Sequence, residues 1–242
     1  MSDYQLETFI GSGRVLFGGF NVGNVTALSH KIETETKSIK ARNGGGTYDS
    51  ITQVLGVQVE MKVSDFNDAN LELALQALKI EHVGGAQTET LTAIAGGEMP
   101  LEFQPDGETP YTVATPDDAT TYVLDTDYEE TPLGIKFLAA GDIANDAAIK
   151  VAYTSVGGTA FEALAASQKE GLLVVDGLND ANGEPFTLSY YRFKVKPMAT
   201  LAPFSDEFAE LELNGDALAD ATKGVGQSKF MRMRKAPSVK SA

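Results

Sequence analysis

The chain of 242 residues contains no cysteine and no tryptophan, and it has only two histidines. Without cysteine it has no disulfide, no thiolate nucleophile and no cysteine-ligated zinc, so its stability depends on packing and assembly. His30 and His82 have no companion histidine at ligand spacing, which argues against a metal site or a serine-histidine-aspartate arrangement. We therefore expect no catalytic residue, no metal and no cofactor, and we interpret both histidines as surface or packed side chains.

Two further motifs lack the residues that their chemistry requires. The acidic residues Asp125, Asp127, Glu129 and Glu130 suggest calcium, but no loop glycine and no spaced terminal glutamate complete an EF-hand. The glycines between Gly11 and Gly19 are not followed by Gly-Lys-Ser or Gly-Lys-Thr, so they do not form a phosphate loop. We interpret the first group as a solvated turn and the second as an arm and a bend.

Long apolar runs are also absent. The N-terminal sequence has no basic segment followed by an apolar stretch, and no later run approaches the length that spans a bilayer. We expect a soluble cytoplasmic product without a membrane partner.

Basic residues are scarce and unevenly placed. The chain has 19 lysines and arginines against 34 acidic residues, a net charge of −15, which argues against specific nucleic-acid binding. From Lys223 to Ala242 there are six basic residues and no acidic one, so the first 222 residues carry a net charge of −21. This opposition favours head-to-tail assembly, in which one copy's basic end meets the next copy's acidic surface. A solvated, disordered tail is the alternative.

Alternating apolar residues predict a β-rich chain. From Ile51 to Val63 the odd positions are apolar except Gln53, which predicts a long strand with one wet face. Val25–Thr34 predicts its hairpin partner across a glycine-containing loop. Leu172–Val175 and the return from Phe186 predict a second hairpin, and a change of apolar phase predicts a bulge at Tyr190 or Tyr191. A last strand alternates Leu211 and Leu213 with glutamates.

Between these hairpins the pattern changes to a helical period. Leu71, Ala74, Leu75 and Leu78 share one helical face, which predicts an amphipathic helix over roughly 68–78 that lies against a sheet. The stretch up to about Ser155 indicates short strands joined by turns, and 161–168 is compatible with a short helix.

Four segments in this order resemble the major tail tube proteins of long-tailed bacteriophages. They are GNVTALSHKIETETKSIKARNGGG (23–46), the strand-to-helix passage QVLGVQVEMKVSDFNDANLELALQAL (53–78), the stretch 121–155 with Asp127-Tyr128 and Tyr153-Thr154, and the stretch 177–218 with Lys196-Pro197. The resemblance spans most of the chain, although 90–154 is longer than the smallest members of that family require.

The resemblance implies a mainly β fold, a sandwich or barrel of antiparallel strands with one flanking helix. It implies a single domain over 1–222 with an N-terminal arm and a long hairpin loop at 35–49, followed by a basic C-terminal arm at 223–242. Members form rings, usually hexameric, that stack through the hairpin loop and terminal arms. The implied contacts between rings are Lys37, Lys40, Arg42, Gly44, Gly45 and Gly46 in the loop, and Lys229, Phe230, Arg232, Arg234 and Lys235 in the C-terminal arm.

The resemblance implies a tube that conducts DNA during ejection without binding it tightly. Gln58, Glu60, Glu210 and Glu212 alternate with apolar positions, so they are candidates for a channel lining, with solvated strand faces as the alternative. A carboxylate-rich lining repels phosphate over about 8 Å in physiological salt. The resemblance implies a virion protein, not an enzyme, assembled in the host cytoplasm with tail proteins such as a tape measure and a tail terminator.

Two alternative classes remain open, of which the more distant is a hydrolase, which needs a constellation of carboxylates that sequence order does not reveal. A monomeric β-sandwich could bind carbohydrate or a cell surface as an adhesion module. Such a module presents exposed aromatic platforms, and the absence of tryptophan argues against it.

Overall fold

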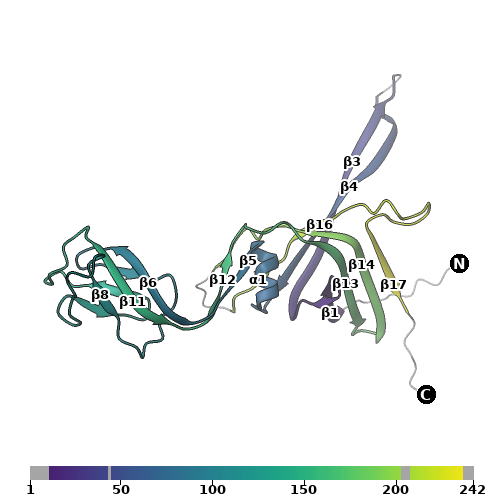
Figure 1. Ribbon diagram of the computed structural model, residues 1–242. Helices are drawn as coiled ribbons and strands as arrows, with labels where there is room; N and C mark the ends of the chain where they lie inside the picture. Colours follow the sequence, from purple (N-terminus) through teal and green to yellow (C-terminus); the bar gives the residue numbers. More distant parts are fainter. Residues whose placement is uncertain (1–10, 43–44, 203–207, 237–242) are drawn as a thin grey trace, which may run out of the picture. The chain divides into compact units, whose positions relative to one another are not determined.

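The computed structural model describes residues 11–42, 45–202 and 208–236 (Figure 1). It is mainly β, with antiparallel sheets and one helix among the described residues. The chain divides into two compact units: a main unit up to Leu78 and from Phe161 onward, and an inserted unit, Lys79–Ala160. The predicted single domain over 1–222 therefore differs from the structure. That prediction came from the resemblance, in which 90–154 was surplus length, and neither the resemblance nor chain length reveals where a second core begins.

The main unit is built on a nine-stranded antiparallel sheet. Its path is β15-β4-β16-β14-β13-β1-β2, with β3 paired to β4 and β17 paired to β14, and within the described residues it does not close into a barrel. The strands are β1 (Gly11–Phe17), β2 (Phe20–Asn21), β3 (Val25–Lys40), β4 (Thr47–Val63), β13 (Glu170–Asn179), β14 (Glu184–Val195), β15 (Leu211–Glu212), β16 (Gly215–Ala217) and β17 (Met231–Lys235).

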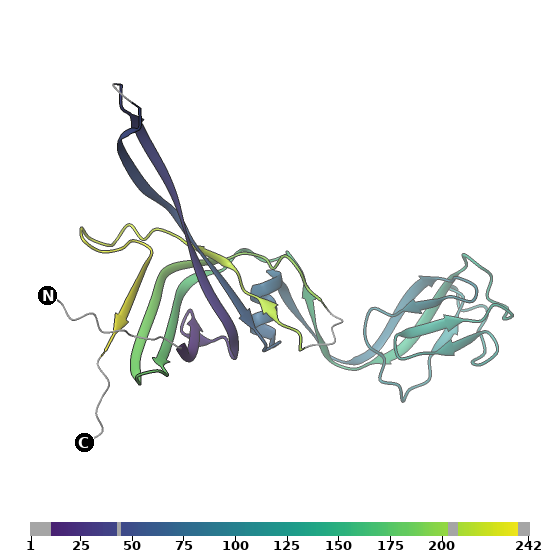
Figure 2. The ribbon, with the colours of Figure 1, turned by 180° about the vertical axis from the view of Figure 1, so that it is seen from behind.

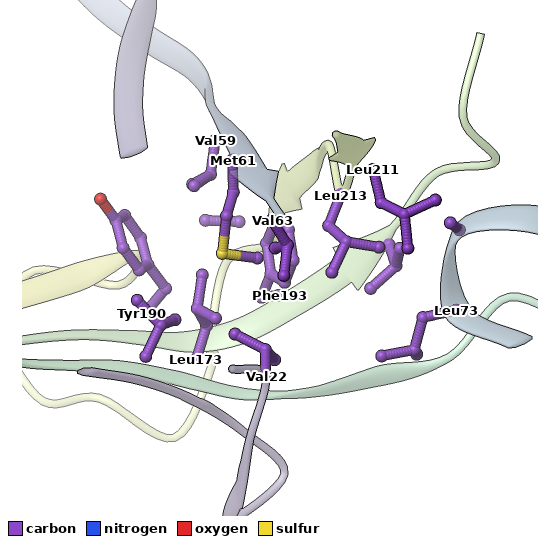
Figure 3. Packing of buried hydrophobic residues seen from close by; sticks show 14 of the residues in the cluster. Val22, Val59, Met61, Val63, Leu73, Leu173, Tyr190, Phe193, Leu211 and Leu213 are labelled. Atoms are coloured by element: carbon purple, nitrogen blue, oxygen red, sulfur yellow. The ribbon is translucent and has the colours of Figure 1, made fainter. Parts of the chain in front are cut away.

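One apolar core holds this sheet together. Side chains from β4, β14 and the β15–β16 segment converge there with Leu73 of the helix α1 (Asp68–Leu75), as Figure 3 shows. Tyr190 and Phe193 are the largest aromatic side chains fully buried in it, and Phe17 packs edge-on against Phe193 with ring centroids 6.1 Å apart. Burying such side chains supplies most of the folding free energy.

The predicted bulge in the second hairpin is confirmed. Gly171 pairs with Phe193 and Leu173 pairs with Tyr190, so Tyr191 and Arg192 together lie opposite the single residue Leu172. The extra residue shifts the phase, which is why Tyr190 and Phe193 both point into the core although three positions separate them.

A second bulge corrects the predicted face of β4. Glu33 pairs with Gly56 and Thr34 pairs with Val54, so Leu55 is an extra residue. Val57, Val59, Met61 and Val63 line the core as predicted, but Ile51 lies on the opposite face because the bulge inverts the phase beyond it. Apolar residues alternate along β4 without a break in the sequence, whereas the pairing of β4 with β3 shifts by one residue at Leu55.

Helix α1 ends earlier than predicted and is fixed by a buried amide. Gln76 adopts φ 48°, and the Ala77 amide donates to the Glu72 carbonyl, so the helix stops at Leu75 and not near Leu78. At the other end Asn67 caps the helix by accepting from the Asn70 amide. The buried Asn70 side chain donates to the carbonyls of Val22 and Asp65 at 2.8 and 2.9 Å.

Replacing Asn70 with leucine will lower the free energy of unfolding of the main unit by about 2–4 kcal/mol, because two carbonyls lose their donor. Asn67→Ala is the control, since loss of an exposed cap costs about 1 kcal/mol. Urea denaturation followed by circular dichroism measures both. An Asn70→Leu variant no less stable than the Asn67→Ala variant would contradict this account.

The inserted unit has a core of its own. One three-stranded sheet has the order β6-β11-β8 and the other β7-β10-β9, and Ile135, Phe137, Ile149 and Val151 are fully buried between them. The strands are β6 (Gly85–Thr92), β7 (Glu98–Pro100), β8 (Thr112–Ala114), β9 (Tyr128–Glu130), β10 (Gly134–Phe137) and β11 (Ala148–Ser155). The short strands predicted up to Ser155 belong to this unit.

A two-stranded ribbon of β5 (Leu78–His82) and β12 (Gly158–Glu162) marks the two passages of the chain between the units. The short helix considered for 161–168 is absent from these described residues. Phe161 and Glu162 continue β12, and turns follow. The helical pattern there was too short to outweigh strand pairing.

Candidate functional surfaces

The β3–β4 hairpin projects beyond the core of its own unit (Figures 1 and 2). Its ladder runs from Val25–Val63 to Lys40–Thr47, so most of the loop predicted at 35–49 is paired strand, up to Lys40 on one side and from Thr47 on the other. We call residues 34–54 the hairpin arm. None of the buried residues of the main core lies in this arm.

The two faces of the hairpin arm differ in chemistry. One face carries the pairs Thr34–Val54, Thr36–Thr52 and Ser38–Ser50, and the two threonine hydroxyls lie 2.9 Å apart. The other face carries Glu35–Gln53, Lys37–Ile51 and Ile39–Asp49. The first face is mainly hydroxyl-bearing, and the second combines charges with isoleucines.

Large apolar side chains of the arm are uncovered. Ile39, Ile51 and Tyr48 are 65, 63 and 80% exposed, and Leu55 at the base is 62% exposed. A two-stranded hairpin is marginally stable by itself, and a cluster of exposed apolar side chains marks an interaction surface. The arm therefore has the properties of an element that is completed by a partner.

The tip of the arm is basic. Lys37 lies 3.7 Å from the Glu35 carboxylate, and Lys40 and Arg42 follow with no acidic residue between positions 36 and 47. Gly45 and Gly46 have φ of 80° and 98°, which a side chain would strain, so these glycines are needed for the turn. Gly44, also predicted as a contact, lies outside the described residues.

The predicted C-terminal arm is partly integrated into the sheet. Residues 231–235 form β17, whose ladder with β14 includes Arg232–Ser189 and Arg234–Thr187. Phe230 packs against the main core, and Lys229 is exposed. Lys235 pairs with Phe186 in the ladder. Residues 223–236 are therefore not a separate appendage, because Phe230 and Met231 pack against the core and β17 pairs with β14. Residues 237–242 lie outside the described residues.

The residues predicted to line a channel share one sheet face. Gln58, Glu60, Glu210 and Glu212 all lie opposite the core-facing positions of their strands. Lys62 lies on the same face, and its Nζ donates to the Glu210 carboxylate at 3.1 Å. A hydrogen bond from Thr26 and the bond from Lys62 hold the pKa of Glu210 below its usual range, and Glu210 in turn raises the pKa of Lys62.

This face is mixed in charge. Lys196 pairs with Asp216 and Arg192 pairs with Glu170, each at 2.7 Å, in addition to Lys62 with Glu210. Three of its cations, Lys62, Arg192 and Lys196, are therefore neutralised by neighbouring carboxylates, which lowers the positive charge left to hold a phosphate.

Most of the negative charge of the chain lies in the inserted unit. Residues 79–160 contain 14 acidic and three basic residues, a net charge of −11 out of −15. Lys79, Lys136 and Lys150 each form an ion pair inside the unit, with Glu81, Glu129 and Asp118 respectively. The sequence shows that acidic residues are in excess, but only the division into two units shows that most of this excess belongs to the inserted unit.

An open groove of about 1110 Å³ lies at the end of the β3–β4 ladder opposite the arm. It is lined by Asn24, Thr26, Ser64, Phe66, Phe208, Ala209 and Glu210. Phe66 is 41% exposed and Phe208 98% exposed. The sequence alone does not indicate this groove, although Phe66 lies within the strand-to-helix passage 53–78.

Both histidines have structural partners. The His30 Nδ1 and the buried Tyr190 hydroxyl lie 3.0 Å apart, and burial raises the pKa of Tyr190 to about 12. His82 stacks on Phe103, with ring centroids 3.7 Å apart, and its Nε2 lies 2.8 Å from the Ser155 hydroxyl. No group of three or more histidines and carboxylates among the described residues is placed to hold a metal ion.

No helix within the described ranges is long and apolar enough to cross a membrane. Comparison with protein families gives one finding that covers nearly the whole chain: residues 8–234 match a family described as "Protein of unknown function UCP028589". No curated protein matches the chain.

Proposed function

The chain belongs to the UCP028589 family, and from its surfaces we propose that it is a structural virion protein that oligomerises into stacked rings, the tube of a bacteriophage tail. The observation that carries the proposal is the projecting hairpin arm with its uncovered apolar side chains. The rings are hexameric by the resemblance to major tail tube proteins described above, and the tube is the conduit for DNA ejection. The protein then resides in the virion after assembly in the host cytoplasm.

The edges of the sheet support self-assembly. Among the described strands, β3 pairs only with β4, so one side of a 16-residue strand offers backbone donors and acceptors to another chain. An unpaired edge of this length invites pairing. When an interface joins two different surfaces of identical subunits, it produces a closed ring or an open filament. The unpaired edge of β3 and the hairpin arm are two surfaces that can form such interfaces.

The charged sheet face suits a conduit. Glu60, Glu210 and Glu212 carry carboxylates, which do not bind phosphate, and Lys62 is held by Glu210. Each unpaired lysine or arginine would add affinity for DNA and so resist its passage. We propose that this face borders the channel, that DNA passes without specific binding, and that tape measure and terminator proteins meet the ends of the tube.

Size-exclusion chromatography combined with negative-stain electron microscopy of the purified chain tests the proposal. We expect rings or tubes whose population rises with protein concentration. A chain that stays monomeric at the highest attainable concentration, alone and with a tail-tip complex as nucleus, would overturn the proposal and favour the adhesion module.

A further inference from the structure

We propose that the hairpin arm of one copy docks into the Phe66–Phe208 groove of a second copy. The inference rests on the proposed function, since it names the receptor for the arm in the assembled state. Two uncovered apolar features of the main unit, the arm and the groove, are matched in this contact.

The positions of the two features set the direction of assembly. The groove lies beside Thr26 and Ser64, where the β3–β4 ladder begins, and the arm ends in the turn after Lys40. At about 3.3 Å per residue, the 14 steps from Thr26 to Lys40 separate them by roughly 45 Å along an extended strand. An arm cannot fold back over such a distance as a paired ladder, so the groove that it fills belongs to another copy.

Shape and polarity match an extended ribbon. The groove is open and combines the two phenylalanine rings with hydrogen-bonding groups of Asn24, Thr26 and Ser64. The arm offers Ile39 and Ile51 on one face, together with Tyr48. Apolar side chains of the arm cover the rings, and the polar groups of the groove remain available to the strand backbone.

Charge favours the same pairing. The groove carries the carboxylate of Glu210, and that of Asp65 lies beside it, where it accepts from the Asn24 amide, against the cation Lys62 paired with Glu210. The arm tip carries Lys37, Lys40 and Arg42 without an acidic residue between positions 36 and 47. The opposite signs accelerate encounter and exclude docking of one arm tip on another.

The contact joins copies that stack in the same orientation, since the arm and the groove lie at opposite ends of one ladder; a two-fold pair that exchanged arms would instead stop at a dimer and would contradict the stacking. Each copy that inserts its arm leaves its own groove open, so addition continues along the ladder direction. The contact thus specifies stacking of rings, while the edge pairing proposed above joins copies within a ring.

The absence of cysteine allows a direct test with two singly substituted full-length chains. Ile51→Cys places a thiol on the arm, and Ala209→Cys places one in the groove. Mixing the two variants under mild oxidation should give a disulfide-linked heterodimer, identified by mass spectrometry of the joined peptides. Mixing Ile51→Cys with Phe20→Cys, an exposed position on β2, should not.

If the wild-type chain forms tubes but the mixture of Ile51→Cys and Ala209→Cys variants gives no linked heterodimer, the docking inference is overturned. The proposed function then still stands. If wild-type chain forms no rings or tubes, the proposed function fails first. A heterodimer at the Ile51–Phe20 control level would also overturn the docking inference.

A second measurement uses matched phenylalanines. Phe66→Ser removes an apolar wall of the groove, and Phe20→Ser removes an equally large exposed ring elsewhere on the same unit. We expect Phe66→Ser to raise the concentration at which half the chain sediments as tubes by about tenfold or more, from the lost apolar burial. Equal effects of the two substitutions, with both variants folded by circular dichroism, would contradict the proposal.

Discussion

Replacing residues 40–48 with an Asn-Gly turn will leave a folded monomer that no longer forms rings or tubes. Ile39 and Asp49 already face each other in the ladder, so a two-residue turn closes the shortened hairpin. The core loses nothing, because its β4 residues begin at Val57. What disappears is Tyr48 with Lys40 and Arg42, which we expect to contact a second copy together with Ile39 and Ile51.

Negative-stain microscopy and sedimentation of the shortened chain measure this outcome, with circular dichroism and urea denaturation to establish that it is folded. The matched control replaces residues 180–183, the turn between β13 and β14 of the same unit, with Asn-Gly. That variant should still assemble. Tubes of ordinary length from the chain without its arm tip would show that the arm is not needed for assembly.

Truncating Phe193 or Phe137 to alanine will destabilise one unit and leave the other unchanged. Both rings are fully buried, Phe193 in the main core and Phe137 in the core of the inserted unit. Loss of a buried phenylalanine costs about 3–5 kcal/mol, from lost transfer free energy and from the cavity that remains. The two cores share no residue, so each substitution should act on its own unfolding transition.

Differential scanning calorimetry will show this as two transitions, of which each variant moves a different one downward. Hydrogen exchange of β11 and β14 assigns the transitions to their units. Each substitution serves as the control for the other. A single transition that both substitutions shift alike would contradict the division into two cooperative units.

Features that depend on local alternation were predictable from the sequence. The second hairpin, its phase change near Tyr190 and the start of α1 after Asn67 each follow from a few neighbouring residues, and the structure confirms them. The end of α1 was not predictable in the same way. Leu78 fits the helical face, but the left-handed conformation of Gln76 breaks the helix before it.

Features that depend on pairing between distant residues were not predictable. Ile51 continues the apolar alternation of β4, and only its partner Lys37 reveals that the bulge at Leu55 turns it outward. The inserted unit was indicated as surplus length at 90–154, but its core depends on β11 meeting both β6 and β8. The Phe66–Phe208 groove joins segments more than 140 positions apart, so no local pattern indicates it.

The ribbon of β5 and β12 brings the chain into and out of the inserted unit side by side. A segment whose two ends start next to each other can be lengthened, shortened or exchanged at an entropic cost that grows only slowly with its size. The ribbon is consequently a suitable insertion site for a foreign domain. A reporter or a binding domain placed between His82 and Gly158 would then be present in every copy of the chain.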